Sequence, residues 1–317
     1  MARDRTIHAK PEDVGQYDPV AGWRKRPVAL RPGRKTNAMT VDVEDYFQVE
    51  AFFSYIARAE WDSRECRVEA NVERILELFA LKGVTATFFT LGWIAKRYPR
   101  MVRRIVSSGH ELASHGLSHF RADQQSRVQF LDDVTQAKAL LEDIGGTAVR
   151  GYRATSFSIT RRNLWALNSL EEAGYSYSSS THPIPHDLYG IPEQPRFPFY
   201  PFEDSKFMEI PVTTVRKFGR NWPAGGGGYF RLLPYALFKR NLQSVQKNEN
   251  QPCTFYFHPW EIDPGQPRIA GASAKTRFRH YLNLDRTYSR LERLLNDFEW
   301  SSIASVHNIE PAPNHDA

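Results

Sequence analysis

Hydrophobic and polar residues follow two alternating periods along residues 38–306. Short runs of apolar, β-branched or aromatic residues predict strands. Longer segments with apolar residues three and four positions apart predict amphipathic helices, several of which end at a glycine such as Gly83 or Gly145. We expect strands at 38–44, 84–90, 110–115, 148–153, 175–178, 207–213, 253–258 and 302–306, and helices at 67–82, 93–107, 123–144, 161–172, 234–247 and 276–297.

The order of these elements predicts an α/β fold. Repeated alternation of strand and helix is typical of a parallel sheet that is closed, or nearly closed, into a barrel. Segment 182–201 is rich in proline and aromatic residues and is expected to be irregular. The glycine run at 225–228 lacks a following Lys-Ser/Thr and an evident helix start, so it is a weak candidate for a phosphate loop. The last helix is expected to bury Phe278, Leu282, Leu291 and Leu295.

Charge is unevenly distributed. Residues 1–36 carry nine Lys or Arg and four acids, which places +5 of the net charge of +6 in this segment. The segment contains four prolines and no hydrophobic periodicity, so we expect a flexible basic N-terminal arm. The rest of the chain carries only +1, and nucleic-acid binding is not expected of it. One folded domain is expected over 37–307, followed by a tail over 308–317.

Other bulk features are those of an ordinary globular chain. No apolar run reaches the roughly 18 residues that a membrane span requires, and the N-terminus shows no apolar signal segment. Cys66 and Cys253 are too few for a disulfide framework. We therefore expect a cytoplasmic protein without an integral membrane segment. The sequence leaves the oligomeric state open.

Three carboxylates follow the first expected strand of the domain. Asp42, Glu44 and Asp45 come at the end of an apolar run, although strand interiors avoid charges unless these are paired or bound to a metal. The period of two places Asp42 and Glu44 on one face and Asp45 just beyond the strand. The alternative is a set of ordinary surface acids where a strand meets a loop.

Histidine and arginine residues recur at the ends of later strands. His115 and His119 are four residues apart, and on a helical turn both rings would reach one divalent ion. Arg153 and His258 also end expected strands, which is where barrel enzymes build their sites. Two unrelated surface histidines are the alternative for a lone H-x-x-x-H pattern.

These motifs, in this order, resemble those of the NodB-type polysaccharide deacetylases, carbohydrate esterase family four. The resemblance extends over about residues 38–306. It rests on Thr40-Val-Asp-Val-Glu-Asp45, Ser114-His-Gly-Leu-Ser-His119, Arg153-Ala-Thr-Ser-Phe157 and Thr254-Phe-Tyr-Phe-His258. Asp187-Leu-Tyr-Gly-Ile-Pro192 and Phe257-His-Pro-Trp-Glu-Ile-Asp263 are similar to one subgroup, which is linked to exosortase-associated exopolysaccharide loci. The portion from about 182 to 307 is expected to be specific to that subgroup.

The resemblance implies a distorted (β/α) barrel of about seven strands and a catalytic domain that hydrolyses a carbon–nitrogen bond other than a peptide bond. The implied reaction removes N-acetyl groups from an amino-sugar polysaccharide or its precursor, in exopolysaccharide biosynthesis. The implied cofactor is a divalent metal ion. A ligand set of two imidazoles and a carboxylate favours zinc. The N-acetylated glycan is the expected binding partner.

The resemblance also implies residue roles. Asp42 matches the general base, Arg153 the residue that orients it, and His258 the acid that protonates the sugar nitrogen. A backbone N–H near Ser156 would bind the oxyanion, and Trp260 is a candidate substrate contact. The expected metal ligands are His115, His119 and a carboxylate, with Glu44 preferred and Asp45 as the rival.

Several positions depart from the family pattern. Val43 stands where the usual metal carboxylate would be, and Gly116 replaces a Ser or Thr that would hydrogen-bond near the metal. Thr155 replaces a proline, which predicts a less rigid backbone. Ser178 replaces the Asp that tunes the acid, which predicts a lower pKa and a less fixed tautomer for His258.

The departures leave a second hypothesis from another class, a non-catalytic carbohydrate-binding or scaffold protein on a degenerate barrel. A third hypothesis is an amide hydrolase of small cyclic or ureido substrates.

Overall fold

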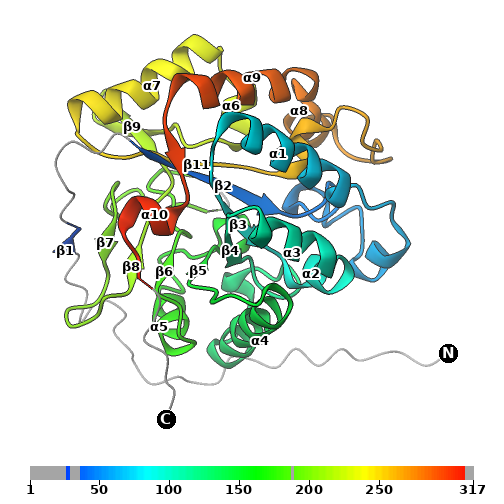
Figure 1. Ribbon diagram of the computed structural model, residues 1–317, viewed down its shortest axis with the longest axis horizontal. Coiled ribbons are helices and arrows are strands. Elements are labelled where there is room, and N and C mark those ends of the chain that lie inside the picture. The colour runs from blue at the N-terminus through cyan, green and yellow to red at the C-terminus, as the bar shows by residue number, and fades with distance from the viewer. Residues whose placement is uncertain (1–25, 29–35, 187–188, 311–317) are drawn as a thin grey trace.

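The computed structural model describes residues 26–28, 36–186 and 189–310, and a mostly parallel sheet lies at its centre (Figure 1). The strand order is β1-β7-β8-β6-β5-β4-β3-β2-β11, and β12 also pairs with β2. All pairs from β8 to β11 are parallel, whereas β7 is antiparallel to β8 and β1 to β7. The strands are β1 (Arg26–Pro27), β2 (Asn37–Val43), β3 (Thr87–Thr90), β4 (Glu111–Ser114), β5 (Gly151–Tyr152), β6 (Tyr177–Ser178), β7 (Phe199–Tyr200), β8 (Met208–Glu209), β11 (Thr254–Phe257) and β12 (Trp300–Ser301).

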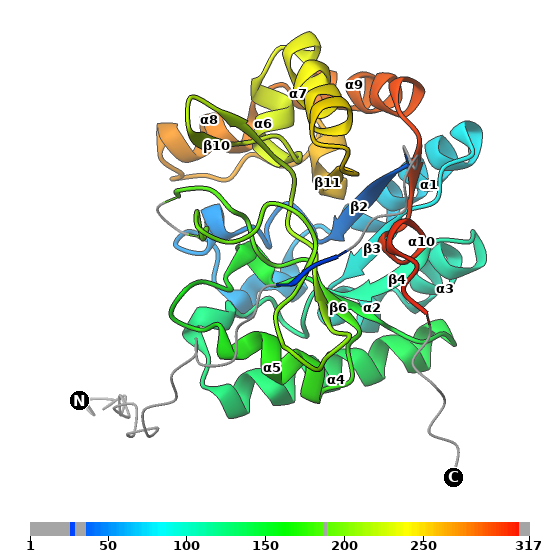
Figure 2. The same ribbon diagram turned by 90° about the vertical axis from the view of Figure 1, so that its left-hand side faces the viewer.

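Helices cover the sheet on several sides. In Figures 1 and 2, α7 and α9 lie on one side of the sheet, and α4 and α5 lie on the opposite side. The helices are α1 (Val68–Lys82), α2 (Gly92–Arg97), α3 (Pro99–Ser107), α4 (Arg127–Gly145), α5 (Trp165–Glu172), α6 (Gly227–Leu232), α7 (Tyr235–Asn248), α8 (Ala274–Tyr281), α9 (Leu284–Asp297) and α10 (Ile303–His307). A separate hairpin consists of β9 (Thr214–Lys217) and β10 (Arg220–Pro223). Within the described ranges, none of the helices has both the length and the apolar character needed to cross a bilayer.

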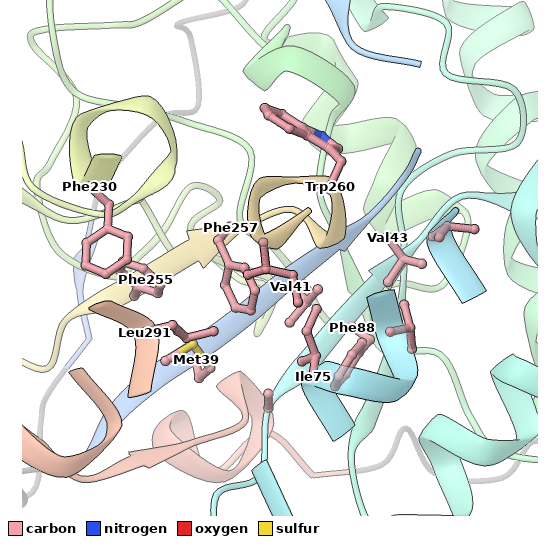
Figure 3. Close-up of a cluster of buried hydrophobic side chains, with 14 of the residues drawn as sticks. Met39, Val41, Val43, Ile75, Phe88, Phe230, Phe255, Phe257, Trp260 and Leu291 are labelled. Atoms are coloured by element: carbon pink, nitrogen blue, oxygen red, sulfur yellow. The ribbon is translucent and has the colours of Figure 1, made fainter. Parts of the chain in front are cut away.

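The alternation of side chains in β2 separates the main core from the candidate site. Met39, Val41 and Val43 pack in a large apolar cluster with residues of α1, β11 and α9 (Figure 3). The intervening Thr40 and Asp42 are also buried, and both accept hydrogen bonds from one buried arginine. A strand with apolar residues on one face and polar residues on the other can therefore be buried on both faces only if its polar groups are paired.

The chain that follows β8 reaches β11, at the far end of the strand order. The N–H of Thr213 donates to the carbonyl of Thr254 at 3.3 Å, and the N–H of Tyr256 donates to Gly225 at 2.8 Å. The expected α/β fold with a mostly parallel sheet is confirmed, and this contact is consistent with the expected distorted barrel.

Two expected helices are each divided in two. The helix expected at 93–107 breaks at Tyr98, because the residue before a proline is disfavoured in helical conformation, and Pro99 then begins α3. The helix expected at 276–297 breaks at Leu282 and Asn283, which are extended and left-handed respectively. The expected burial of Phe278 is wrong, since 59% of this residue is exposed.

Two further elements differ from the sequence prediction. Residues 302–306 are expected to be a strand, but Ile303–His307 form α10, and Ser302 caps this helix by accepting a hydrogen bond from the N–H of Ser305. The strand in this part of the chain is β12, which begins two residues before the expected strand. The glycine run also differs, since α6 begins at Gly227.

Short parts of the expected arm and tail fall within the described residues. Most of 1–36 lies outside the described residues, but Arg26 and Pro27 form β1, and the N–H of Val28 donates to Pro198. At the other end, the carbonyl of Ile309 accepts a hydrogen bond from Arg150 at 2.9 Å. Residues 26–28 and 308–310 are therefore parts of the described fold.

Candidate active site

A buried arginine fixes the carboxylate of Asp42 at the end of β2. Nη1 of Arg153 donates to Oδ1 of Asp42 and to the hydroxyl of Thr40, each at 2.6 Å. Its Nε and Nη2 donate to the carbonyl and the hydroxyl of Ser179 at 3.0 and 2.8 Å. Because Arg153 is fully buried and its fork is held on both sides, Asp42 has one oxygen committed to it. The other oxygen, Oδ2, lies 3.9 Å from Nε2 of His258.

Glu44, His115 and His119 form a compact cluster beside Asp42. Each offers one ligand atom, and these atoms lie within 4.8 Å of one another. Nε2 of His119 lies 2.6 Å from Oε2 of Glu44, and Nε2 of His115 lies 4.0 Å from the same oxygen. All three side chains are buried. Two imidazoles and a carboxylate are a ligand set typical of zinc and related divalent ions.

The protonation states in this cluster suit a cation. Nδ1 of His115 donates to the carbonyl of Arg153 at 2.9 Å, which leaves Nε2 as the lone-pair nitrogen on the Glu44 side. Burial lowers the pKa of His115 to about 4. Burial alone would raise the pKa of Glu44, but the neighbouring His119 and His258 lower it to about 2. The cluster is therefore a carboxylate with at least one neutral imidazole, and these residues fit a divalent ion.

The two histidines lie on a loop rather than on a helical turn. Gly116 and His119 have φ angles of 80° and 58°, and the carbonyls of Gly116 and Leu117 accept hydrogen bonds from the first residues of α2. The expected helical turn is wrong for this reason, although both rings still approach Glu44. A Cβ at Gly116 would lie 3.1 Å from Oδ2 of Asp133, which instead accepts from the N–H of Leu117.

Asp45 does not join the cluster. Its Oδ2 accepts hydrogen bonds from the N–H groups of Arg67 and Val68, at the start of α1, and its Oδ1 accepts from Tyr46. Burial raises the pKa of Asp45 to about 6, against the opposite effect of these N–H groups. The structure thus places the rival ligand at a helix N-terminus, where the otherwise unpaired N–H groups favour an acceptor.

His258 has a carboxylate partner that the sequence analysis missed. Its Nδ1 lies 2.7 Å from Oε1 of Glu261, and Oε2 of Glu261 accepts from Nε of Arg231 at 2.7 Å. Burial alone would lower the pKa of His258, but Glu44, Glu261 and Asp42 raise it to about 9. The expectation of a lower pKa and a loose tautomer, drawn from Ser178, is therefore wrong: Glu44, followed by Glu261 and Asp42, raises the pKa, and Glu261 fixes Nδ1.

Ser178 and Thr155 are engaged in other contacts. The hydroxyl of Ser178 donates to that of Ser180 at 2.7 Å. The hydroxyl of Thr155 donates to the carbonyl of Phe120 at 3.0 Å, beside His119. The segment without the expected proline is thus tied to the loop that carries His119.

Ser156 and Trp260 both border the cavity above the cluster. Ser156 is left-handed, with φ of 54°, and the N–H of the next residue, Phe157, donates to Ala154. The ring of Trp260 is stacked between His258 and His280, at centroid distances of 5.2 and 4.2 Å. Its exposed area is small, so it shapes the wall next to the acid.

The site residues meet in one cavity of about 230 Å³. Asp42, Glu44, His115, His119 and His258 all line it. Aromatic and charged residues that the sequence analysis did not single out complete its wall: Glu50, Arg121, Phe157, Tyr189, Arg231, Tyr256, Glu261 and Arg279. The signal that could have identified Glu261 is its position three residues after His258, inside a segment already quoted as a motif.

The fold and this cavity define an α/β protein with a candidate metal-binding site at the carboxyl ends of its parallel strands. Two family profiles match successive parts of the chain. The profile described as polysaccharide deacetylase matches residues 60–178, and a domain of unknown function (DUF3473) matches residues 179–308.

Curated relatives match shorter segments. A peptidoglycan deacetylase of Helicobacter pylori is 31% identical over 86 residues, which cover 27% of this chain and 29% of that protein. A peptidoglycan-N-acetylglucosamine deacetylase of Bacillus cereus is 24% identical over 123 residues, 35% of this chain and 45% of the relative. A chitooligosaccharide deacetylase of Sinorhizobium fredii is 44% identical over 45 residues, 14% of this chain and 21% of the relative. The chain thus matches less than half the length of each of these relatives.

One solved structure is similar over most of its length. It is that of a Mycobacterium smegmatis protein described as a candidate polysaccharide deacetylase, with 18% identity and a TM-score of 0.58. The match covers 89% of this chain and 92% of that one, and it shows a shared fold. Residues 60–178 thus match the polysaccharide deacetylase family model, and the similar solved structure shares the fold of the chain.

Proposed function

We propose that this protein is a metal-dependent hydrolase that removes N-acetyl groups from an amino-sugar polysaccharide or its precursor. The observation that carries the proposal is the placement of Asp42 and His258, whose Oδ2 and Nε2 lie 3.9 Å apart, beside the Glu44, His115 and His119 cluster. Amide hydrolysis needs a base for water and an acid for the leaving amine, and each of these two residues has its own buried partner.

Each residue has a distinct task in this reaction. Glu44, His115 and His119 would hold the divalent ion, for which we propose zinc, and the bound ion supplies Lewis acidity toward the acetyl carbonyl and water. Asp42 accepts the proton of the attacking water through Oδ2, because Arg153 holds Oδ1. Nε2 of His258 donates a proton to the sugar nitrogen as the amide bond breaks. The N–H of Ser156 is the candidate donor to the oxyanion, since that of Phe157 is bonded to Ala154.

The substrate class is supported by the relatives. Those described above are named as deacetylases of peptidoglycan and of chitooligosaccharide, both N-acetylated glycans. Similarity to the subgroup linked to exopolysaccharide loci supports an exopolysaccharide as the polymer. We therefore propose an N-acetylated exopolysaccharide or its oligosaccharide precursor as the substrate.

The test is release of acetate from N-acetylated oligosaccharides by the purified chain, with metal content measured on the same sample. Zinc-loaded protein should release acetate, and removal of the metal by a chelator should abolish this until zinc is restored. Asp42→Asn serves as the matched inactive control. Binding of these glycans without acetate release under any divalent metal would instead favour the non-catalytic binding protein.

A further inference from the structure

The tip of the β9–β10 hairpin carries an aromatic residue that the local fold does not require. Phe218 and Gly219 form the two-residue turn between the paired residues Lys217 and Arg220, with φ angles of 52° and 73°. Such turns favour Asn-Gly, because a bulky side chain at positive φ is strained. Phe218 is also 96% exposed, so packing does not compensate for the strain. The position points to a role outside the folded chain.

All charged residues in the sequence around the hairpin are cations. Residues 210–248 contain seven Lys or Arg and neither Asp nor Glu. Arg231 is paired with Glu261, and Lys239 with Asp297. The other five cations form no ion pair with a carboxylate among the described residues: Arg216, Lys217, Arg220, Arg240 and Lys247. The small net charge of residues 37–317 hides this local excess.

The hairpin and α7 bring Lys217, Arg240 and Lys247 to one groove, and Arg216 and Arg220 lie on the hairpin beside it. Nζ of Lys217 donates to Oδ1 of Asn241 at 2.6 Å, which ties the hairpin to α7. A groove between the two elements is lined by Phe218, Leu237, Arg240 and Lys247, among others. Leu237 is 40% exposed, and Trp222 on β10 is 51% exposed. We call Arg216, Lys217, Phe218, Arg220, Trp222, Leu237, Arg240 and Lys247 the hairpin patch.

We propose that the hairpin patch docks on the surface of an anionic phospholipid bilayer. Cations near such a surface attract its headgroups, and exposed aromatic and aliphatic side chains enter the interface between headgroups and acyl chains. A soluble acidic polysaccharide would account for the cations but not for a fully exposed phenylalanine at the tip. The inference is independent of the proposed reaction.

Docking would also position the active site. The chain leaves β10 at Pro223 and runs directly into the glycine segment, of which Gly227 and Gly228 line the active-site cavity. A bilayer contact at the hairpin would therefore hold this rim of the cavity near the membrane surface.

The test is co-sedimentation of the full chain with vesicles of phosphatidylcholine alone and of phosphatidylcholine with phosphatidylglycerol. The wild type should bind the anionic vesicles and little of the neutral ones, and salt should weaken binding. Phe218→Asn, which suits the turn, should reduce partitioning about tenfold. Arg216→Gln with Arg220→Gln should reduce it roughly 10-fold to 30-fold.

Matched control variants lie on other elements. Leu81→Gln removes an exposed apolar residue of α1, and Arg100→Gln with Arg103→Gln removes two exposed cations of α3. Both should bind as the wild type does, and any contribution of the basic segment 1–36 is common to all variants. Equal binding of wild type and hairpin variants would overturn the proposal. A second outcome would also overturn it. If only the charge variant lost vesicle binding, and the wild type bound soluble heparin as tightly as it bound the anionic vesicles, the patch would be assigned to an acidic polymer.

Discussion

Oε1 of Glu261 lies 2.7 Å from Nδ1 of His258, only three residues away in the sequence. The geometry fixes the ring with Nε2 toward Asp42 and Glu44, at 3.9 and 3.5 Å. Arg231 in turn holds the other oxygen of Glu261, so the acid is supported by a buried pair. In the family pattern this support comes from an aspartate at the position of Ser178, which precedes His258 in the sequence. Here it comes from Glu261, which follows His258.

Glu261→Gln should slow the release of acetate from amide substrates about 10-fold to 100-fold, with metal content unchanged. The amide of Gln has no charge to keep His258 protonated, and proton donation to a sugar nitrogen should suffer. Hydrolysis of 4-nitrophenyl acetate should change little, because nitrophenolate leaves without a proton. The measurement is kcat on both substrates.

Glu73→Gln on the surface of α1 is the control for this variant, since its carboxylate pairs only with exposed Arg104 among the described residues. Equal losses on the amide and on the aryl ester would contradict a role through the acid. They would indicate instead that the unpaired Arg231 disturbs the whole site.

Asp42→Asn and Glu44→Gln should separate base from ligand. The amide at position 42 still accepts a hydrogen bond from Arg153 but cannot take a proton, so acetate release should fall about 10²-fold to 10⁴-fold with metal retained. Glu44→Gln should lower zinc occupancy, and excess zinc should partly restore activity. Metal content and kcat measured together decide between these patterns.

His115→Ala and His119→Ala provide the positive control for metal loss. Both should be depleted of zinc while circular dichroism remains that of the wild type. Full occupancy in both variants would rule out the proposed ligand set.

Asp45→Ala should destabilise the fold and leave the chemistry intact. Its carboxylate accepts from two N–H groups at the start of α1, and loss of such a cap costs about 1–2 kcal/mol. Asp45→Asn keeps an acceptor and should lose less, as measured by urea unfolding. A drop in zinc occupancy comparable to that of Glu44→Gln would show that Asp45 acts at the metal after all.

Local sequence patterns predicted the part of the site that depends on single strands. The period of two places Asp42 on the face of β2 opposite Met39 and Val41, and the structure has it there. Glu44 follows directly after β2 and lines the same cavity as Asp42. The strand ends that carry Arg153 and His258 were also predicted, because strand length and burial leave a clear apolar signal.

Features that depend on contacts between distant segments were not predicted. The sequence favours Glu44 over Asp45 as the ligand, but the contacts that hold Asp45 away from the cluster depend on where α1 begins. The support of His258 depends on Arg231, thirty positions before Glu261. Helix breaks such as that at Asn283 depend on single left-handed residues, which hydrophobic periodicity does not detect. Net charge likewise hid the hairpin patch, because acids elsewhere in the chain balance it.

His110 should make the stability of the fold depend on pH. It is buried against Phe79 and Phe88, and its Nδ1 accepts from the N–H of Ala86 at 3.2 Å. Burial lowers its pKa to about 4, whereas the unfolded chain has the ordinary value of about 6.5. The unfolded state therefore binds the proton more readily. The contribution of neutral His110 to stability is complete above the unfolded pKa and is lost as the pH falls through the folded one.

Between about pH 7 and about pH 5 this titration should cost the wild type roughly 2 kcal/mol of unfolding free energy. His110→Asn keeps the acceptor for Ala86 but does not titrate, so its loss over the same interval should be smaller by that amount. His110→Phe fills the space without an acceptor, and it should be less stable than His110→Asn at both pH values yet show the same reduced pH dependence. Urea unfolding of the three proteins at the two pH values makes the comparison. Equal losses in all three would mean that the folded protein accommodates the protonated ring, and that the pH dependence arises from other groups such as buried His182 and His280, whose pKa values burial also lowers.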